Sequence, residues 1–141
     1  MKFAISLVFT LSVMVGSSHG GVCEGKKHPG ITAIYLTQSV KADSAAEQWV
    51  STFRDRLEAS KPYCIVPDKD KATMVISMVG MDADINKTST AISLAIYTVR
   101  DSVFLDHWMY VADKESLESS CDKAVAALQK EMKELKRLRL I

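Results

Sequence analysis

Three apolar runs lie one after another: Ala72-Thr-Met-Val-Ile-Ser-Met-Val-Gly80, Thr88-Ser-Thr-Ala-Ile-Ser-Leu-Ala-Ile-Tyr-Thr-Val99 and Ser102-Val-Phe-Leu-Asp-His-Trp-Met-Tyr-Val111. All three are rich in β-branched and aromatic residues and are bounded by Asp, Asn, Lys or Arg, which is typical of β-strands. None of them contains a catalytic motif. The three runs therefore predict the strands around which the rest of the chain is organised.

The last two runs form a hairpin if Arg100 and Asp101 are its tip. Side chains alternate across a strand, so this tip fixes which residues face each other. One face then holds the pairs Ile92–Met109, Leu94–His107, Ile96–Leu105 and Thr98–Val103. The other face holds four aromatic rings: Tyr97, Phe104, Trp108 and Tyr110. Arg-Asp lacks the Gly or Asn that two-residue hairpins favour, and a three-residue loop would exchange the two faces of one strand.

Shorter signals surround these strands. Residues 31–36 and 63–66 are apolar runs that suit short strands. Ser44 stands three residues before Glu47 as a capping box, and helically spaced apolar residues follow it, which predicts a helix. This helix should end before Pro62, because the residue preceding a proline avoids helical angles. Residues 114–139 carry one long apolar stripe, which predicts a second helix.

The predicted order is β-α-β-β-β-β-α, with a single β-α-β crossover. The first two strands should therefore be parallel and the later ones antiparallel. We expect an α+β fold with a single mixed, mostly antiparallel five-stranded sheet and two helices on one face. Residues 21–141 would form this domain, because about 120 residues suffice for one core but not for two.

Residues 1–20 have the form of a secretory signal peptide. Lys2 precedes an apolar run over residues 3–15, and Ser18 and Gly20 form a small-x-small cleavage site. The run is well short of the ~20 residues that span a bilayer, which argues against a membrane anchor. We therefore expect a secreted or periplasmic product.

The charge balance and the motifs of the chain argue against several classes of function. Lys and Arg number 18 and Asp and Glu 17, and this near-neutral balance argues against a nucleic-acid binder. The residues provide no phosphate loop, acid/base pair or Cys/His signature, so neither a cofactor nor a cysteine nucleophile is expected.

Three cysteines follow the leader, which fits an oxidising compartment. They allow one bridge and leave one thiol free. Cys121 lies on the helix stripe that faces the sheet, so we expect a Cys64–Cys121 bridge, although Cys23 has the reach to compete for either partner. Cys23 and His28 alone lack the second pair of ligands that a zinc site requires.

Asp82, Asp84 and Asn86 match the first half of a calcium loop. The second half fails, because Lys87 replaces the loop glycine and Ser93 the bidentate glutamate. A polar connection without a metal is therefore predicted. Asn86 also begins a glycosylation sequon, which matters only in eukaryotic secretion.

Several segments resemble a family of bacterial envelope modules typified by the amino-terminal domain of TolB and the core domain of the curli secretion protein CsgG. They are the helix from Trp49 to Leu57, Tyr63-Cys-Ile-Val66, Lys71-Ala-Thr-Met-Val-Ile76 and the hairpin Ala95-Ile-Tyr-Thr-Val-Arg-Asp101. Thr73 replaces the usual Asp of the third strand, and Asp101-Ser102 lacks the family's Thr-Gly turn. The resemblance implies a non-enzymatic, protein-binding role in the cell envelope.

We therefore expect an exported binding or accessory module of the envelope or extracellular space. Its predicted contact surface, for a partner protein or a second copy, is the face bearing Tyr97, Phe104, Trp108 and Tyr110. Alternatively, residues 21–30 cover these rings, or a shifted register places them in the core. The alternative function is a small secreted enzyme that uses His107 with Asp106 or Asp82, although a packed core histidine is the simpler interpretation of His107.

The carboxyl-terminal turns are basic and end in apolar residues. The basic side chains are Lys130, Lys133, Lys136, Arg137 and Arg139, and the apolar ones are Leu138, Leu140 and Ile141. Basic residues at this end of a helix stabilise its dipole. The alternative is contact with an anionic membrane surface or a partner.

Overall fold

The computed structural model describes residues 30–42, 44–86 and 88–141, and it confirms the predicted order of elements. The strands are β1 (Thr32–Ser39), β2 (Tyr63–Ile65), β3 (Met74–Asp82), β4 (Ser89–Thr98) and β5 (Phe104–Asp113). The helices are α1 (Ala45–Glu58) and α2 (Leu117–Arg137), and a short 3-10 turn covers Lys69–Lys71. The expected signal peptide and the free Cys23 lie outside the described residues.

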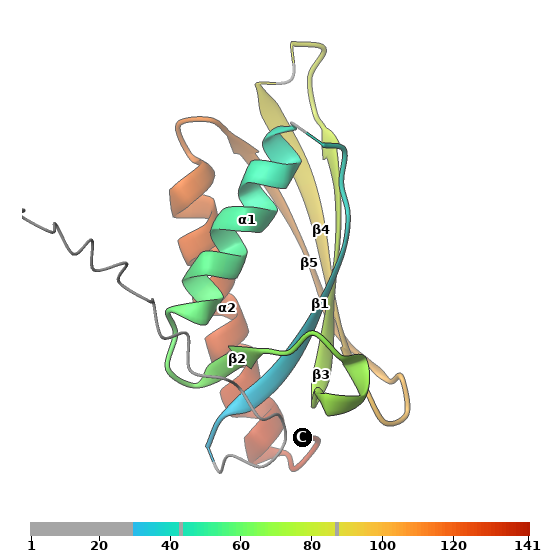
Figure 1. Ribbon diagram of the computed structural model, residues 1–141. Coiled ribbons are helices and arrows are strands. Elements are labelled where there is room, and N and C mark those ends of the chain that lie inside the picture. The colour runs from blue at the N-terminus through green and yellow to red at the C-terminus, as the bar shows by residue number, and fades with distance from the viewer. Residues whose placement is uncertain (1–29, 43, 87) are drawn as a thin grey trace, which may run out of the picture.

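The five strands form one mixed sheet in the order β2-β1-β3-β4-β5. β1 pairs in parallel with both β2 and β3, whereas β3–β4 and β4–β5 are antiparallel, so the sheet holds two pairings of each kind. The prediction that every strand after the second is antiparallel is wrong for β3, because the chain crosses from β2 to the other side of β1 and runs parallel to it there. Both helices lie on the same side of this sheet (Figure 1). The expected α+β fold is therefore confirmed, and no helix of the described residues lies on the other face of the sheet.

The core lies between the sheet and the helices. Its largest fully buried side chains are Trp49, Phe53, Ile34, Leu57, Met74, Ile76, Met78, Ile92, Leu94, Ile96, Leu128 and Val50. On the strands these residues occupy alternate positions, as a sheet with one covered face requires. α1 begins where the capping box predicts, because the Ser44 hydroxyl accepts a hydrogen bond from the Glu47 N–H at 3.1 Å.

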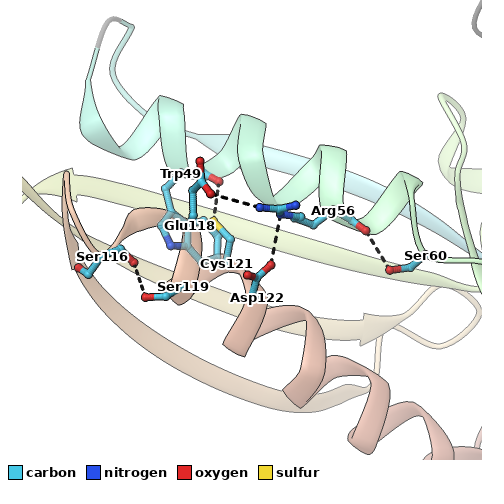
Figure 2. A network of polar contacts seen from close by, with 8 residues as sticks. All are labelled: Trp49, Arg56, Ser60, Ser116, Glu118, Ser119, Cys121 and Asp122. Carbon is cyan, nitrogen blue, oxygen red and sulfur yellow. Dashed lines mark hydrogen bonds and ion pairs between the residues drawn. The ribbon is translucent and has the colours of Figure 1, made fainter.

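Trp49 links the two helices to the sheet. Its ring stacks on Phe53 at a centroid distance of 5.2 Å and on Tyr110 of β5 at 5.7 Å. Its indole N–H donates to the Ser120 hydroxyl of α2 at 3.0 Å, and the Cys121 thiol donates to the Trp49 carbonyl at 3.4 Å. Figure 2 shows where Trp49 and Cys121 meet between the helices. The buried tryptophan therefore has its polar group satisfied, as burial requires.

Arg56 makes the exposed part of the same helix contact. Its guanidinium lies 3.4 Å from Glu118 and 3.2 Å from Asp122, both on α2 (Figure 2). All three side chains are substantially exposed, so each pair contributes little, about 0–1 kcal/mol. The interface between the helices is therefore stabilised mainly by Trp49 and its apolar neighbours.

The β4–β5 register differs from the predicted one after its first pairs. Tyr97 faces Phe104 as expected, but the ladder then contains a β-bulge, and Leu94 faces Trp108 instead of His107. The bulge adds one residue to β5, which exchanges the two faces for the rest of the strand. Trp108 therefore lies on the helix side, and His107 lies on the uncovered side.

The expected Cys64–Cys121 bridge is wrong, because Cys121 is a free, fully buried thiol. Cys64 is disulfide-bonded, so it has a different partner. The remaining cysteine of the sequence, Cys23, lies outside the described residues.

Burial of Cys121 gives the fold a predicted sensitivity to alkali. Desolvation, followed by the charge of Asp122, raises the pKa of its thiol from 9.0 to about 12. An acid whose pKa is higher in the folded state stays protonated there while the unfolded chain ionises, so stability should fall as pH rises from 9 towards 12. One such group costs up to about 1.4 kcal/mol for each pH unit in that window.

Urea unfolding at pH 8 and pH 10 measures this effect. We expect the wild type to lose stability between the two pH values and Cys121→Ala to lose less. Desolvation also raises the pKa of Tyr63, from 10.0 to about 12. Tyr63→Phe is the control: an unfolded tyrosine is only about half ionised at pH 10, so this variant should recover less of the lost stability than Cys121→Ala does. An equal loss in the wild type and in Cys121→Ala would contradict the assignment to the thiol.

Candidate binding surface: the uncovered face of the sheet

The uncovered face is defined by the strand registers. Successive rows across β3, β4 and β5 contain Val75–Tyr97–Phe104, Ser77–Ala95–His107, Val79–Ser93–Met109 and Met81–Ala91–Val111. β1 extends the first three rows on this face with Tyr35, Thr37 and Ser39. Its composition changes along the strands from aromatic, through polar, to aliphatic.

The aliphatic end is the most exposed apolar region of the sheet. The exposed fractions are 45% for Val79, 64% for Met81, 68% for Met109 and 70% for Val111. We call these four residues, together with the half-buried Ala91 between them, the apolar patch. Such patches on a folded domain mark interaction surfaces, and methionine adapts its shape to different partners.

The aromatic end retains half of the predicted contact surface. Tyr97 and Phe104 meet edge to face with their centroids 5.7 Å apart, and Phe104 is 55% exposed. Val103, in the adjoining loop, is 51% exposed. The structure therefore places these two predicted rings together on the uncovered face.

Trp108 and Tyr110, the other two predicted rings, lie on the helix side of β5. Both are half-buried and pack against the core, and Tyr110 stacks on Trp49. Burial, followed by the nearby Asp106 carboxylate, raises the pKa of Tyr110. The four rings do not form one surface, because the bulge turns this pair towards the helices.

The polar middle of the face holds a serine–histidine pair. Ser93 Oγ lies 2.8 Å from His107 Nε2, and both residues project from the uncovered face. A hydrolytic triad would also need a carboxylate on the imidazole Nδ1. The Asp106 carboxylate instead accepts the backbone N–H of His107 at 2.7 Å. His107 is exposed, so the expectation of a packed core histidine is wrong.

The predicted calcium-like loop forms a turn. Asp84 accepts hydrogen bonds from the N–H groups of Thr88 at 2.8 Å and of Ser89 at 3.2 Å, and from the Thr88 hydroxyl. These bonds lower the pKa of its carboxyl. Within the described residues no group of three or more metal-ligating side chains is found.

A separate hollow lies at the carboxyl end of α2. About 270 Å³ in volume, it is lined by Pro62, Tyr63, Gln129, Met132, Lys133 and Lys136. Two lysines of the basic end therefore border an apolar depression. Arg137 is paired with Glu134, and Leu138 and Leu140 are exposed. No helix in the described part of the chain is long and apolar enough to cross a membrane.

No protein-family model matches the chain, and neither does any curated protein sequence. Among solved structures, TolB from Acinetobacter baumannii matches with a TM-score of 0.56 at 7% identity, over 72% of this chain and 28% of TolB. The dodecamer of a PelC variant from Paraburkholderia phytofirmans matches with a TM-score of 0.52 at 12% identity, over 74% of this chain and 93% of PelC.

The chain shares its fold with PelC and with a part of TolB. The predicted resemblance to TolB is thus confirmed for the fold, and the resemblance to CsgG stays a prediction. The chain spans less than a third of TolB. At these identities the fold is all that the matches establish.

The apolar patch was missed by the sequence analysis. Met109 and Val111 alternate with Trp108 and Tyr110 in the sequence, so two faces were evident, but their assignment depended on the hairpin register. The packing of Trp49 is the signal that could have decided which face of β5 lies under the helices. The ring of Tyr110 stacks on the buried Trp49, and aromatic pairs of this kind are favourable.

Proposed function

We propose that this chain is an exported, non-enzymatic binding module of the cell envelope or extracellular space, and that its uncovered sheet face contacts a partner protein. The observation that carries the proposal is the apolar patch, where four large aliphatic side chains are 45–70% exposed on one face. An apolar face of this kind gains free energy when a partner removes it from water, at about 25 cal/mol for each Å².

The fold and the amino-terminal sequence support a place outside the cytoplasm. TolB and PelC share the fold, and the resemblance to envelope modules implies a protein-binding role there. Residues 1–20 have the pattern of an export signal. A chain of this kind would act outside the cytoplasm, in the periplasm or after secretion.

A photo-reactive amino acid at Met81 tests the contact in the producing cells. Met81 lies on β3, in the last row of the uncovered face, and is 64% exposed. We expect a discrete cross-linked product at this position. The matched control is the same amino acid at Glu118 of α2, whose side chain is 79% exposed on the helix side and should give no such product.

Two results would contradict the proposal. One is the absence of any product from Met81 when the protein is folded and exported. The other is an equal yield of the same product from Glu118, which would show random collision. Mass spectrometry of the product then identifies the partner protein.

A further inference from the structure

The outer edge of β5 has a defined set of free backbone groups. β5 pairs only with β4 within the described chain, and β2, at the opposite edge of the sheet, is only three residues long. The Lys114 N–H donates to the Thr88 carbonyl, which continues the β4–β5 ladder. Because antiparallel pairs alternate between bonded and non-bonded, the backbone groups of residues 107, 109, 111 and 113 point away from β4.

Side chains of the same chain already occupy the donors at both ends of this edge. The His107 N–H donates to the Asp106 carboxylate at 2.7 Å, and the Asp113 N–H donates to the Ser116 hydroxyl at 3.1 Å. The N–H groups of Met109 and Val111 between them have no partner in the described structure. An exposed edge of this kind is a template for another strand.

We propose that a second copy of this chain adds its own β5 here, antiparallel, with a two-fold axis beside Tyr110. This contact goes beyond the proposed function, because its hydrogen bonds form at the edge of the sheet; it involves Met109 and Val111 of the apolar patch but not Met81. In this register Met109 of one chain pairs with Val111 of the second copy, and each donates its free N–H to the other's carbonyl. The occupied donors, His107 and Asp113, then lie opposite each other.

The charges select the same register. Asp106 lies opposite Lys114 of the second copy on the helix side, and His107 lies opposite Asp113 on the uncovered side. No like charges face each other along the strand. The neighbouring register has its two-fold axis beside Met109, so that Met109 faces its own copy. Asp106 would then lie opposite Ala112, and the charge complementarity would be lost.

The side chains at the centre also fit a contact between copies. Met109 and Val111 are 68% and 70% exposed, and the pairing would place them side by side across the two chains. Tyr110 would meet its symmetry mate in a close, non-bonded pair, and aromatic cross-strand pairs of this kind are favourable. A second copy therefore satisfies the free donors, the charges and part of the apolar patch together.

Charge reversal tests the register. Lys114→Glu should place a glutamate opposite Asp106 at both ends of the dimer, and Asp106→Lys should place a lysine opposite Lys114. We expect the wild type to dimerise in sedimentation velocity and each variant alone to dimerise roughly tenfold more weakly or worse. An equal mixture of the two variants should recover much of the wild-type affinity as a heterodimer, because an acidic side chain then faces a lysine at each end of the pairing.

Two further variants serve as controls. Lys133→Glu makes the same charge change on α2 and should dimerise like the wild type. Val111→Pro removes one free N–H without breaking the ladder to β4, and proline is tolerated on a sheet edge, so it should fold and stay monomeric. Circular dichroism checks the fold of each variant.

The proposal is overturned by a wild type that stays monomeric at every concentration. Single variants that dimerise like the wild type, or a mixture that fails to recover affinity, overturn it as well. Failure here leaves the partner contact at Met81 intact, because β3 lies two strands, or about 10 Å, from the β5 edge. Loss of the Met81 cross-link likewise leaves the edge pairing intact.

Discussion

Replacing Trp49 with alanine should lower the free energy of unfolding by about 3–5 kcal/mol, the usual loss for a large buried aromatic residue. The side chain is fully buried and stacks on Phe53 and Tyr110, so its removal opens a cavity between both helices and β5. The Ser120 hydroxyl, which accepts the indole N–H, would also lose its partner. Urea unfolding followed by circular dichroism measures the change.

Trp49→Phe separates the two contributions, because phenylalanine keeps a ring in the stack but cannot donate to Ser120. We expect it to lose less stability than Trp49→Ala. Arg54→Ala, an exposed change on the same helix, should stay within about 0.5 kcal/mol of the wild type. A loss below about 1 kcal/mol for Trp49→Ala would show that this stack is not central to the core.

The elements of this fold could be predicted because their signals are local. The Ser44 capping box, the stripe of α2 and the β-branched runs each depend on residues within a few positions. The element order and the β1-α1-β2 crossover follow from these runs, whereas the second crossover, which brings β3 parallel to β1, was not predicted. Placement of both helices on one face was also predicted, because each helix has one apolar stripe to bury.

The candidate surface could not be predicted, because it depends on one inserted residue. The hairpin begins as expected, with the Thr98 N–H donating to the Val103 carbonyl and Tyr97 facing Phe104. The uncertain loop was therefore not the cause of the error. The bulge lets Leu105 pack against the core and brings Trp108 and Tyr110 under the helices, whereas the uninterrupted register would bury His107 and Met109 instead. The bulged register is therefore set by a contact between distant parts of the chain, the packing of Tyr110 on Trp49, and not by residues near the hairpin.

The cysteine prediction failed for a similar reason. The stripe of α2 correctly placed Cys121 towards the core, but orientation alone does not bring two sulfur atoms together. Cys121 meets the Trp49 carbonyl of α1 instead. A buried cysteine here behaves as a small apolar side chain with a weak donor.

Replacing Gly80 with valine should cost about 3 kcal/mol, the upper part of the range for overpacking a core. Gly80 lies on β3 opposite Ile92, on the side that the start of α1 covers. A Cβ atom built there would lie 2.7 Å from Ala46 Cβ and 2.7 Å from Ile92 Cδ1. Ala46 Cβ is fixed by the α1 backbone, so the helix would have to move away from the sheet.

A second substitution that restores space tests this explanation. Ala46→Gly alone should cost about 1 kcal/mol, because glycine disfavours the helix. Combined with Gly80→Ala it removes one of the two closest obstacles, the one fixed by a backbone, so the double variant should be more stable than the sum of the two single changes predicts. Ser77→Ala on the uncovered face of the same strand is the control and should change stability little. Strict additivity of the two changes would contradict the steric explanation, since residues that compete for one space must couple.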